Sequence, residues 1–259
     1  MFHRRVILHL KTQNWTGVAL DLAIVIIGVF IGTQVSNWNQ ERLQKREAER
    51  MLIEIRPALQ YFTDFFDTAK PYYATTSAYA DTALAGWRGD PAVSDKQFVI
   101  AAYQASQIYT LGLNGANWTA IFGGDRLRDI DDEKLRRRLA ALMTIDYDGV
   151  EQISIDTPYR QHVREVIPEM LQDAILGKCA DRPLGESLQV IELPSTCDID
   201  LPDRAFAAGA AALRAKPELA GELRWHRSAI AGFLANLSAI EGQTRQLQQA
   251  IDEVVKPGS

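Results

Sequence analysis

Two histidines lie near carboxylates at the spacing of neighbouring helix turns, which is the pattern that a metal or general-base site needs. His162 precedes Glu165 and Glu169 in one predicted helix, and His226 follows Glu222 by four residues in another. Side chains three or four residues apart share a helix face. No second histidine or cysteine lies close in sequence to complete a metal site. The pattern favours a surface salt-bridge network around His162 and a core position for His226, with no catalytic, cofactor-binding or metal residue assigned.

The chain has two cysteines, Cys179 and Cys197, which frame an irregular stretch near 178–202 that contains proline and glycine. A disulfide closing this loop of about 19 residues would contribute roughly 3 kcal/mol in the loop-entropy picture. Two free buried thiols are the alternative. If the bridge forms, the domain lies in an oxidising compartment.

The stretch from Gly17 to Asn39 is the one segment of the sequence that is apolar enough and long enough to lie in a bilayer. The 18 residues from Val18 to Val35 contain one charge. As a helix they span about 27 Å, close to the hydrocarbon thickness of a membrane. A buried core helix would show a polar face, and Leu22–Ile31 has none. A cleaved signal peptide would need a small-x-small site, which does not follow. The stretch is therefore predicted to be a transmembrane helix at 17–38.

Five residues refine this membrane anchor. Trp15 and Trp38 flank it, where indole rings prefer the headgroup layer. Asp21 lies one turn inside, within reach of headgroup water. Gly28 and Gly32 form a Gly-x-x-x-Gly pair, which allows two helices to approach closely and indicates a possible homodimer through the transmembrane helix. Glycine is also common in membrane helices without any such role.

Charge is unevenly distributed along the 259 residues. Residues 1–50 carry seven Lys/Arg and four Asp/Glu, whereas the rest of the chain carries 21 and 29. The basic N-terminal part suits anionic lipid headgroups. The acidic remainder argues against nucleic acid as a partner.

The remaining sequence predicts an all-α fold, in which the transmembrane helix continues into a soluble antiparallel helical bundle. We divide the chain into a basic N-terminal interfacial segment (1–16), the transmembrane helix (17–38), a juxtamembrane helix (39–60) and a soluble helical domain (61–257). Apolar residues recur at three- and four-residue steps through these helices.

Several local signals set helix boundaries in the soluble part. Pro57 is expected to kink its helix or to start a new one. Ser94 with Gln97 forms a capping-box pattern that opens a helix. Pro217 precedes a long last helix, 218–255, with an apolar stripe.

The segment Ile26–Asn39 ends in Gln-Val-Ser-Asn-Trp-Asn. It resembles bacterial single-pass inner-membrane proteins of unknown function, which have a basic N-terminus, an apolar run ending in a Gln-Val-x-Asn-Trp-Asn signature and a helical domain. The resemblance covers about 40 residues and implies an inner-membrane location, but no activity or catalytic residue.

Orientation rests on conflicting signals. Lys and Arg number three before the apolar stretch and five in the 20 residues after it, which favours a cytoplasmic domain. The cysteine pair, the acidic domain and the basic N-terminus of an uncleaved signal anchor favour the periplasm. We expect a periplasmic C-terminal domain.

The function expected from these features is a membrane-anchored binding or sensor-like module without catalysis, with the lipid bilayer and an unknown protein as partners and no cofactor. The alternative is a membrane-bound hydrolase or metal-dependent enzyme that uses His162 or His226 with nearby carboxylates. A structural protein that dimerises through Gly28 and Gly32 is a third possibility.

Overall fold

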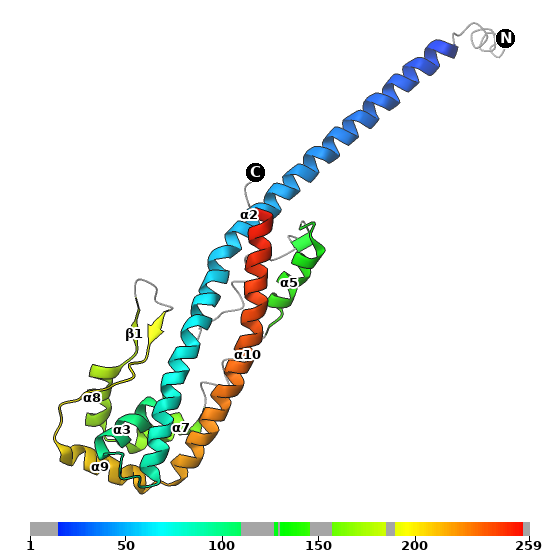
Figure 1. Ribbon diagram of the computed structural model, residues 1–259. Coiled ribbons are helices and arrows are strands. Elements are labelled where there is room, and N and C mark those ends of the chain that lie inside the picture. Colours follow the sequence, from blue (N-terminus) through cyan, green and yellow to red (C-terminus); the bar gives the residue numbers. More distant parts are fainter. Residues whose placement is uncertain (1–14, 110–126, 129, 146–156, 185–189, 256–259) are drawn as a thin grey trace, which may run out of the picture. The chain divides into compact units, whose positions relative to one another are not determined.

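The structure is a computed structural model that describes residues 15–109, 127–128, 130–145, 157–184 and 190–255, with the backbone alone described for 15–18. Apart from one two-stranded sheet, the regular structure of these residues is helical (Figure 1), which confirms the predicted all-α fold. The helices are α2 (Trp15–Trp87), α3 (Asp95–Gln104), α5 (Glu133–Met143), α7 (Pro158–Val166), α8 (Glu169–Cys179), α9 (Asp203–Arg214) and α10 (Glu218–Val255).

The chain divides into two compact units, Met1–Arg50 and Met51–Ser259. Helix α2 contributes residues to both units. The division falls within the segment 39–60, which the sequence assigns to a juxtamembrane helix.

Two prolines lie inside α2, and no new helix begins at either of them. Of the two outcomes expected at Pro57, a kink or a new helix, the new helix is wrong, because α2 continues through both Pro57 and Pro71. A proline leaves the carbonyl four residues earlier without its helical N–H donor. Both prolines are exposed, and the residues four positions earlier, Ile53 and Asp67, are exposed as well. Water can therefore satisfy the freed carbonyls, and the buried face of α2 stays intact.

The second unit has a core formed by the inward faces of α2 and α10 together with the short helices. On α2 this face carries Leu52, Ile55, Leu59, Phe62, Phe65, Phe66 and Tyr73, all at most 2% exposed. Helix α9 packs on α3, α7 and α8. A Cβ added at Gly86 of α2 would overlap the ring of Phe98 in α3, so glycine permits the close approach of these helices.

The helix boundaries in this unit follow the local signals. Ser94 and Gln97 form the reciprocal capping box that opens α3. Asp132 accepts hydrogen bonds from Lys134 N and Leu135 N and so opens α5. Helix α7 begins at Pro158 and ends at Val166, and Pro168 then occupies the N-cap position of α8.

The irregular stretch between α8 and α9 contains the sheet. Strands β1 (Arg182–Pro183) and β2 (Ile191–Glu192) pair antiparallel, with Arg182 opposite Glu192. Residues 185–189, which link them, lie outside the described residues.

Candidate functional site

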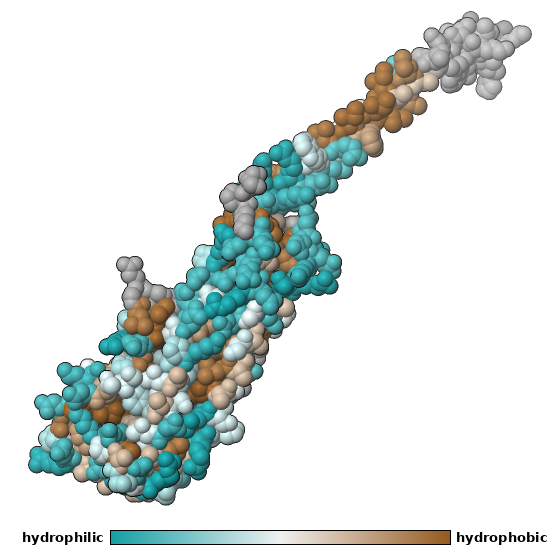
Figure 2. All heavy atoms as spheres, in the orientation of Figure 1, coloured by the Kyte–Doolittle hydropathy of each residue, from teal (hydrophilic) through white to brown (hydrophobic). Residues whose placement is uncertain are grey.

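The apolar part of α2 is exposed around its whole circumference. Its large apolar residues from Leu20 to Val35 are each 55–63% exposed. Helix α2 contains an 18-residue window with a mean hydropathy of 2.0, none of which is buried, so it is long and apolar enough to cross a membrane. Figure 2 shows this band of hydrophobic surface on the N-terminal part of the helix.

The residues assigned to the membrane anchor lie along this helix. Asp21 is exposed near its start. A Cβ at Gly28 or Gly32 would meet nothing within 4 Å, so both positions are open to a second helix. Trp38 is exposed, and the guanidinium of Arg42 lies 4.9 Å from its ring centroid. The side chain of Trp15 lies outside the described residues.

The two histidines have different partners from those that the sequence suggests. His162 Nδ1 lies 2.9 Å from a carboxylate oxygen of Glu222, so α7 is linked to α10. Glu165 instead accepts a hydrogen bond from Gln161 at 2.8 Å. His162 therefore pairs with Glu222 of another helix and not with Glu165 or Glu169, the partners expected from spacing. A carboxylate of this kind can orient an imidazole for base chemistry, but both side chains are partly exposed and neither lines a described pocket.

His226 lies in the core, as its place beside the apolar stripe predicts. Its side chain is fully buried, and its Nδ1 lies 2.7 Å from Thr157 Oγ1. Burial lowers the pKa of His226 to about 4, and the positive charge of Arg160 acts in the same direction, while a hydrogen bond with the backbone of Ala105 raises it. The imidazole is consequently neutral near pH 7. Its Nε2 is buried, and no described residue meets strict distance and angle limits for a hydrogen bond to it, so the contact with Ala105 is a poorly aligned one.

Protein-family models, curated proteins and solved structures gave no match. The resemblance to bacterial single-pass proteins therefore stays a prediction, and the function has to be argued from the residues themselves.

A polar group formed by the buried Tyr72 and the partly exposed Asp181 joins α2 to the segment after α8. The hydroxyl of Tyr72 donates to the Asp181 carboxylate, with both oxygens at 3.0 Å. Burial is the main cause that raises the pKa of Asp181, while the hydrogen bond from Tyr72 and the charge of Arg160 lower it. Burial and the carboxylate together raise the pKa of Tyr72, so its hydroxyl stays protonated. This group fixes the position of two chain segments, and periodicity could not identify it because its members lie 109 residues apart.

A second set of buried hydrogen bonds follows the end of α3. Gln104 Nε2 donates to the carbonyl of Cys179 at 2.7 Å. Arg160 Nη1 donates to the carbonyl of Ser106 at 3.1 Å, and Arg164 Nη2 donates to Gln107 Oε1 at the same distance. These bonds satisfy the polar groups where the chain leaves α3, so the turn can lie inside the unit.

Cys179 and Cys197 are joined by a disulfide, with Cα atoms 5.5 Å apart. The bond ties the last residue of α8 to the segment before α9, and both residues pack in or against the core. Within the described ranges no group of three or more His, Cys, Asp or Glu side chains has the geometry of a metal site.

Ion pairs run along the seam between α2 and α10. Arg56 pairs with Asp252, Asp67 with Arg245 at 2.6 Å, Lys70 with Glu241 at 2.5 Å and Asp81 with Arg227 at 2.6 Å. As the α2 numbers rise, the α10 numbers fall, which shows that the two helices are antiparallel.

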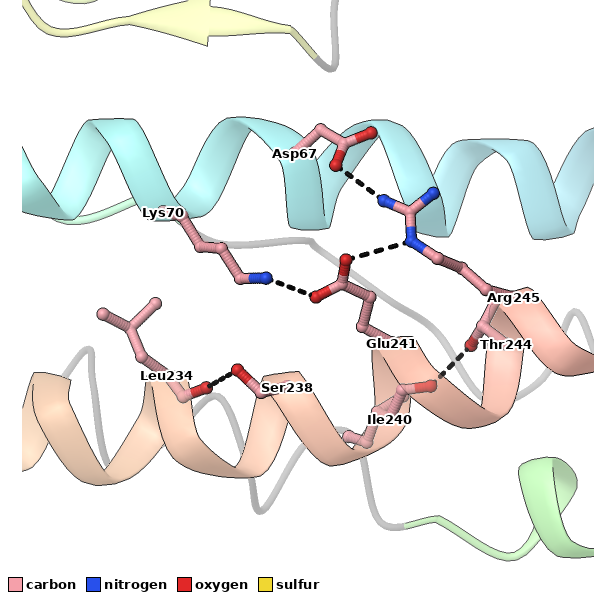
Figure 3. Close-up of polar contacts among 8 residues, drawn as sticks. All are labelled: Asp67, Lys70, Leu234, Ser238, Ile240, Glu241, Thr244 and Arg245. Atoms are coloured by element: carbon pink, nitrogen blue, oxygen red, sulfur yellow. Dashed lines mark hydrogen bonds and ion pairs between the residues drawn. The ribbon is translucent and has the colours of Figure 1, made fainter.

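The centre of this seam is a connected group of four charges (Figure 3). Arg245 contacts both Asp67 and Glu241, and Glu241 also accepts from Lys70. These contacts lower the pKa of Glu241, the hydrogen bond from Lys70 having the largest effect. Because most of these side chains are partly exposed, each pair is worth about 0.2–1 kcal/mol, and the seam fixes register more than it adds stability.

Proposed function

We propose that this chain is a membrane-tethered helical binding module of the bacterial inner membrane, with the unit Met51–Ser259 in the periplasm and no catalytic activity. The main support for a membrane tether is the exposed apolar surface from Leu20 to Val35. Moving one such side chain out of water is worth about 1.5–3 kcal/mol, so leaving this helix in water would cost well over 10 kcal/mol. A bilayer removes that cost because every side of the helix then contacts lipid.

The periplasmic orientation is supported by the disulfide and by charge. A bond between Cys179 and Cys197 persists in an oxidising compartment, whereas the cytosol keeps most thiols reduced. The remainder of the chain is acidic, so the anionic cytoplasmic leaflet does not attract it as it would a strongly basic domain. This charge is consistent with the periplasmic side.

The binding role is supported by recesses in the surface of the second unit. One cleft of about 350 Å³ lies on the α2–α10 seam and is lined by charged and amide side chains: Arg56, Gln60, Arg245, Gln248, Gln249 and Asp252. Another recess is lined mainly by small residues of α2 together with Tyr79 and Ser195. The second recess combines apolar walls with a few hydroxyl groups, which is the kind of concave surface where small molecules and peptide side chains bind.

The tether and the orientation can be tested with the full chain. We expect it to stay in the membrane pellet after carbonate extraction. Alkaline phosphatase fused after Ser259 should be active, and green fluorescent protein fused there should not fluoresce. The reverse pattern would place the unit in the cytoplasm, and a detergent-free, monodisperse full-length protein from the cytosolic fraction would exclude the tether.

The binding role needs its own experiment. The full chain, solubilised in detergent, is used to capture partners, with residues 1–50 fused to an unrelated soluble domain as the matched control. We expect a component that only the full chain retains and that captures this chain in the reciprocal experiment. Repeated recovery of neither a partner nor the chain itself would contradict the proposal.

A further inference from the structure

Two arginines of α7, Arg160 and Arg164, lie one helix turn apart and are held against the end of α3 by hydrogen bonds. Arg160 Nη1 donates to the carbonyl of Ser106 at 3.1 Å. Arg164 donates from Nε to Ser106 Oγ at 3.3 Å and from Nη2 to Gln107 Oε1 at 3.1 Å. The guanidinium of Arg164 also lies 5.0 Å from the ring centroid of Tyr103. All these partners are uncharged, so they satisfy hydrogen bonds but do not neutralise the two positive charges.

The two guanidinium groups share one negative charge, that of Asp181. Among the described residues, no carboxylate lies within ion-pair distance of Arg160 or Arg164. The Asp181 carboxylate acts on both arginines from further away, while it accepts the hydrogen bond from Tyr72. Burial is the main cause that lowers the pKa of Arg160, and the like charge of Arg164 acts in the same direction. Two positive charges and one negative leave this group with one positive charge in excess.

Both arginines are partly exposed, so a dissolved molecule can reach them. A guanidinium has five N–H groups, of which the described residues engage one in Arg160 and two in Arg164. Paired N–H groups of a guanidinium match the two oxygens of a carboxylate. Because the hydrogen bonds to α3 already hold both side chains, little of their rotational freedom is left to lose on binding.

We propose that Arg160 and Arg164 bind the carboxylate group of a small, singly charged ligand. A singly charged anion is favoured over a doubly charged one because Asp181 already offsets one of the two positive charges. The proposal rests on the binding role argued above and deepens it by naming the ligand class for one site.

The test uses 4-fluorobenzoate as the probe and 4-fluorobenzamide as the matched compound of the same shape without the charge. Both are titrated by ¹⁹F NMR at low ionic strength into the full chain in phosphatidylcholine nanodiscs, and empty nanodiscs correct for partitioning into lipid. We expect saturable binding of 4-fluorobenzoate, about 5-fold or more tighter than that of the amide, because hydrogen bonds between charged groups are the stronger ones. Added salt should weaken it.

Two substitutions should change the affinity for 4-fluorobenzoate in opposite directions. Arg160→Gln removes one positive charge and should weaken binding about 5- to 10-fold. Asp181→Asn removes the negative charge that competes with the ligand and should tighten binding about 2- to 5-fold. The amide oxygen of the new side chain can still accept from Tyr72, so the contact with α2 is kept. Tighter binding is not expected if these residues serve the fold alone.

Two further substitutions are the matched controls. Arg88→Gln and Asp200→Asn make the same changes of charge at exposed positions elsewhere in the second unit, and neither should alter the affinity. If Arg160→Gln does not fold, Asp181→Asn and its control still decide the matter, because Asp181 is partly exposed and the substitution preserves its shape.

Competition identifies the class of anion. Acetate should displace 4-fluorobenzoate more effectively than inorganic phosphate, which is largely doubly charged near pH 7. The reverse order would overturn the assignment to a carboxylate.

Three other outcomes would overturn the proposal. They are equal affinity for the acid and the amide, an affinity that neither Arg160→Gln nor Asp181→Asn changes, and no saturable binding up to about 10 mM to a chain that remains in the membrane pellet. None of them affects the tether or the capture of a protein partner, so a failure here is distinguishable from a failure of the proposed function.

Discussion

The two parts of helix α2 are both rich in apolar residues, but their burial is opposite. From Leu20 to Val35 the large apolar side chains are 55–63% exposed, whereas Leu52, Ile55 and Leu59 are at most 1% exposed. In the first part, apolar residues fill every position of consecutive turns. In the second, they recur at three- and four-residue steps between polar ones. The arrangement of apolar residues therefore determines whether a helix needs an apolar solvent on all sides or one packed protein face.

The largest effect is expected from charges in the first part of α2. Ile26→Arg together with Ile27→Arg should move the chain out of the carbonate-resistant membrane fraction, because on the scale measured for helix insertion each central arginine costs about 2.5–3.5 kcal/mol, whereas each Leu, Ile, Phe or Val contributes only about 0.3–0.6 kcal/mol. Immunoblots of pellet and supernatant measure this. Ile53→Arg is the matched control, since Ile53 is exposed in the second part of the helix and should have no effect. Retention of the double variant in the pellet would contradict the view that the first part of α2 holds the chain in the membrane.

A large loss of stability is expected from a cavity in the second part. Phe65 is fully buried, so Phe65→Ala should lower the free energy of unfolding by about 3–5 kcal/mol. Urea unfolding of the full chain in detergent, followed by tryptophan fluorescence, measures the change. Ile53→Ala, at an exposed position of the same helix, should change it by less than about 1 kcal/mol. Similar losses in both variants would show that the buried face of α2 does not contribute to the core.

The buried histidine gives the second unit a pH dependence. The pKa of His226 is about 4 when folded, against an ordinary value near 6.5 when unfolded, so the unfolded state takes up the proton first as pH falls. Stability is therefore full above pH 6.5 and is lost as pH falls towards 4, by about 3 kcal/mol from this group. Urea unfolding at pH 7.5, 5.5 and 4.5 measures it.

The titration of Asp181 changes stability with the opposite sign, so a variant is needed to assign the pH dependence to His226. Burial raises the pKa of Asp181 in the folded state, and this group favours the folded state at low pH and loses that contribution as pH rises through its folded pKa. His226→Gln should remove most of the loss between pH 7.5 and 4.5. An unchanged pH dependence in this variant would assign the effect to other groups.

The same substitution, glycine to alanine, should lower stability at one glycine of α2 and leave it unchanged at another. Gly86→Ala places a methyl group against the ring of Phe98 and should destabilise the protein by about 1–3 kcal/mol. Gly28→Ala meets nothing within 4 Å and should leave the unfolding midpoint within error. Thermal unfolding followed by circular dichroism compares them. Equal midpoints would mean that α2 and α3 are not in close contact at Gly86.

The smallest effect concerns self-association of the first part. Gly28→Ile with Gly32→Ile should reduce cross-linked dimers in native membranes, because bulky side chains prevent close approach of two helices. The pair Val25→Ile and Val29→Ile, on other positions of the same helix, serves as the control. An unchanged dimer yield in the glycine variant would remove the sequence support for a homodimer.

The sequence by itself determined the features that depend on near neighbours. The apolar run, the capping box at Ser94 and Gln97 and the long stripe of α10 all follow from residues within a few turns of one another. At Pro57 the sequence left two outcomes open, a kink or a new helix, because the result depends on whether the freed carbonyl faces water. Helix α2 continues through this proline.

Only the tertiary structure decided which side chains meet. His162 pairs with Glu222 across 60 residues, Thr157 with His226 across 69, and Tyr72 with Asp181 across 109. Spacing along one helix suggested Glu165 as a partner for His162, but that carboxylate contacts Gln161 instead. Periodicity specifies which face of a helix is buried, whereas the partner across the interface depends on how the helices pack, which no local pattern contains.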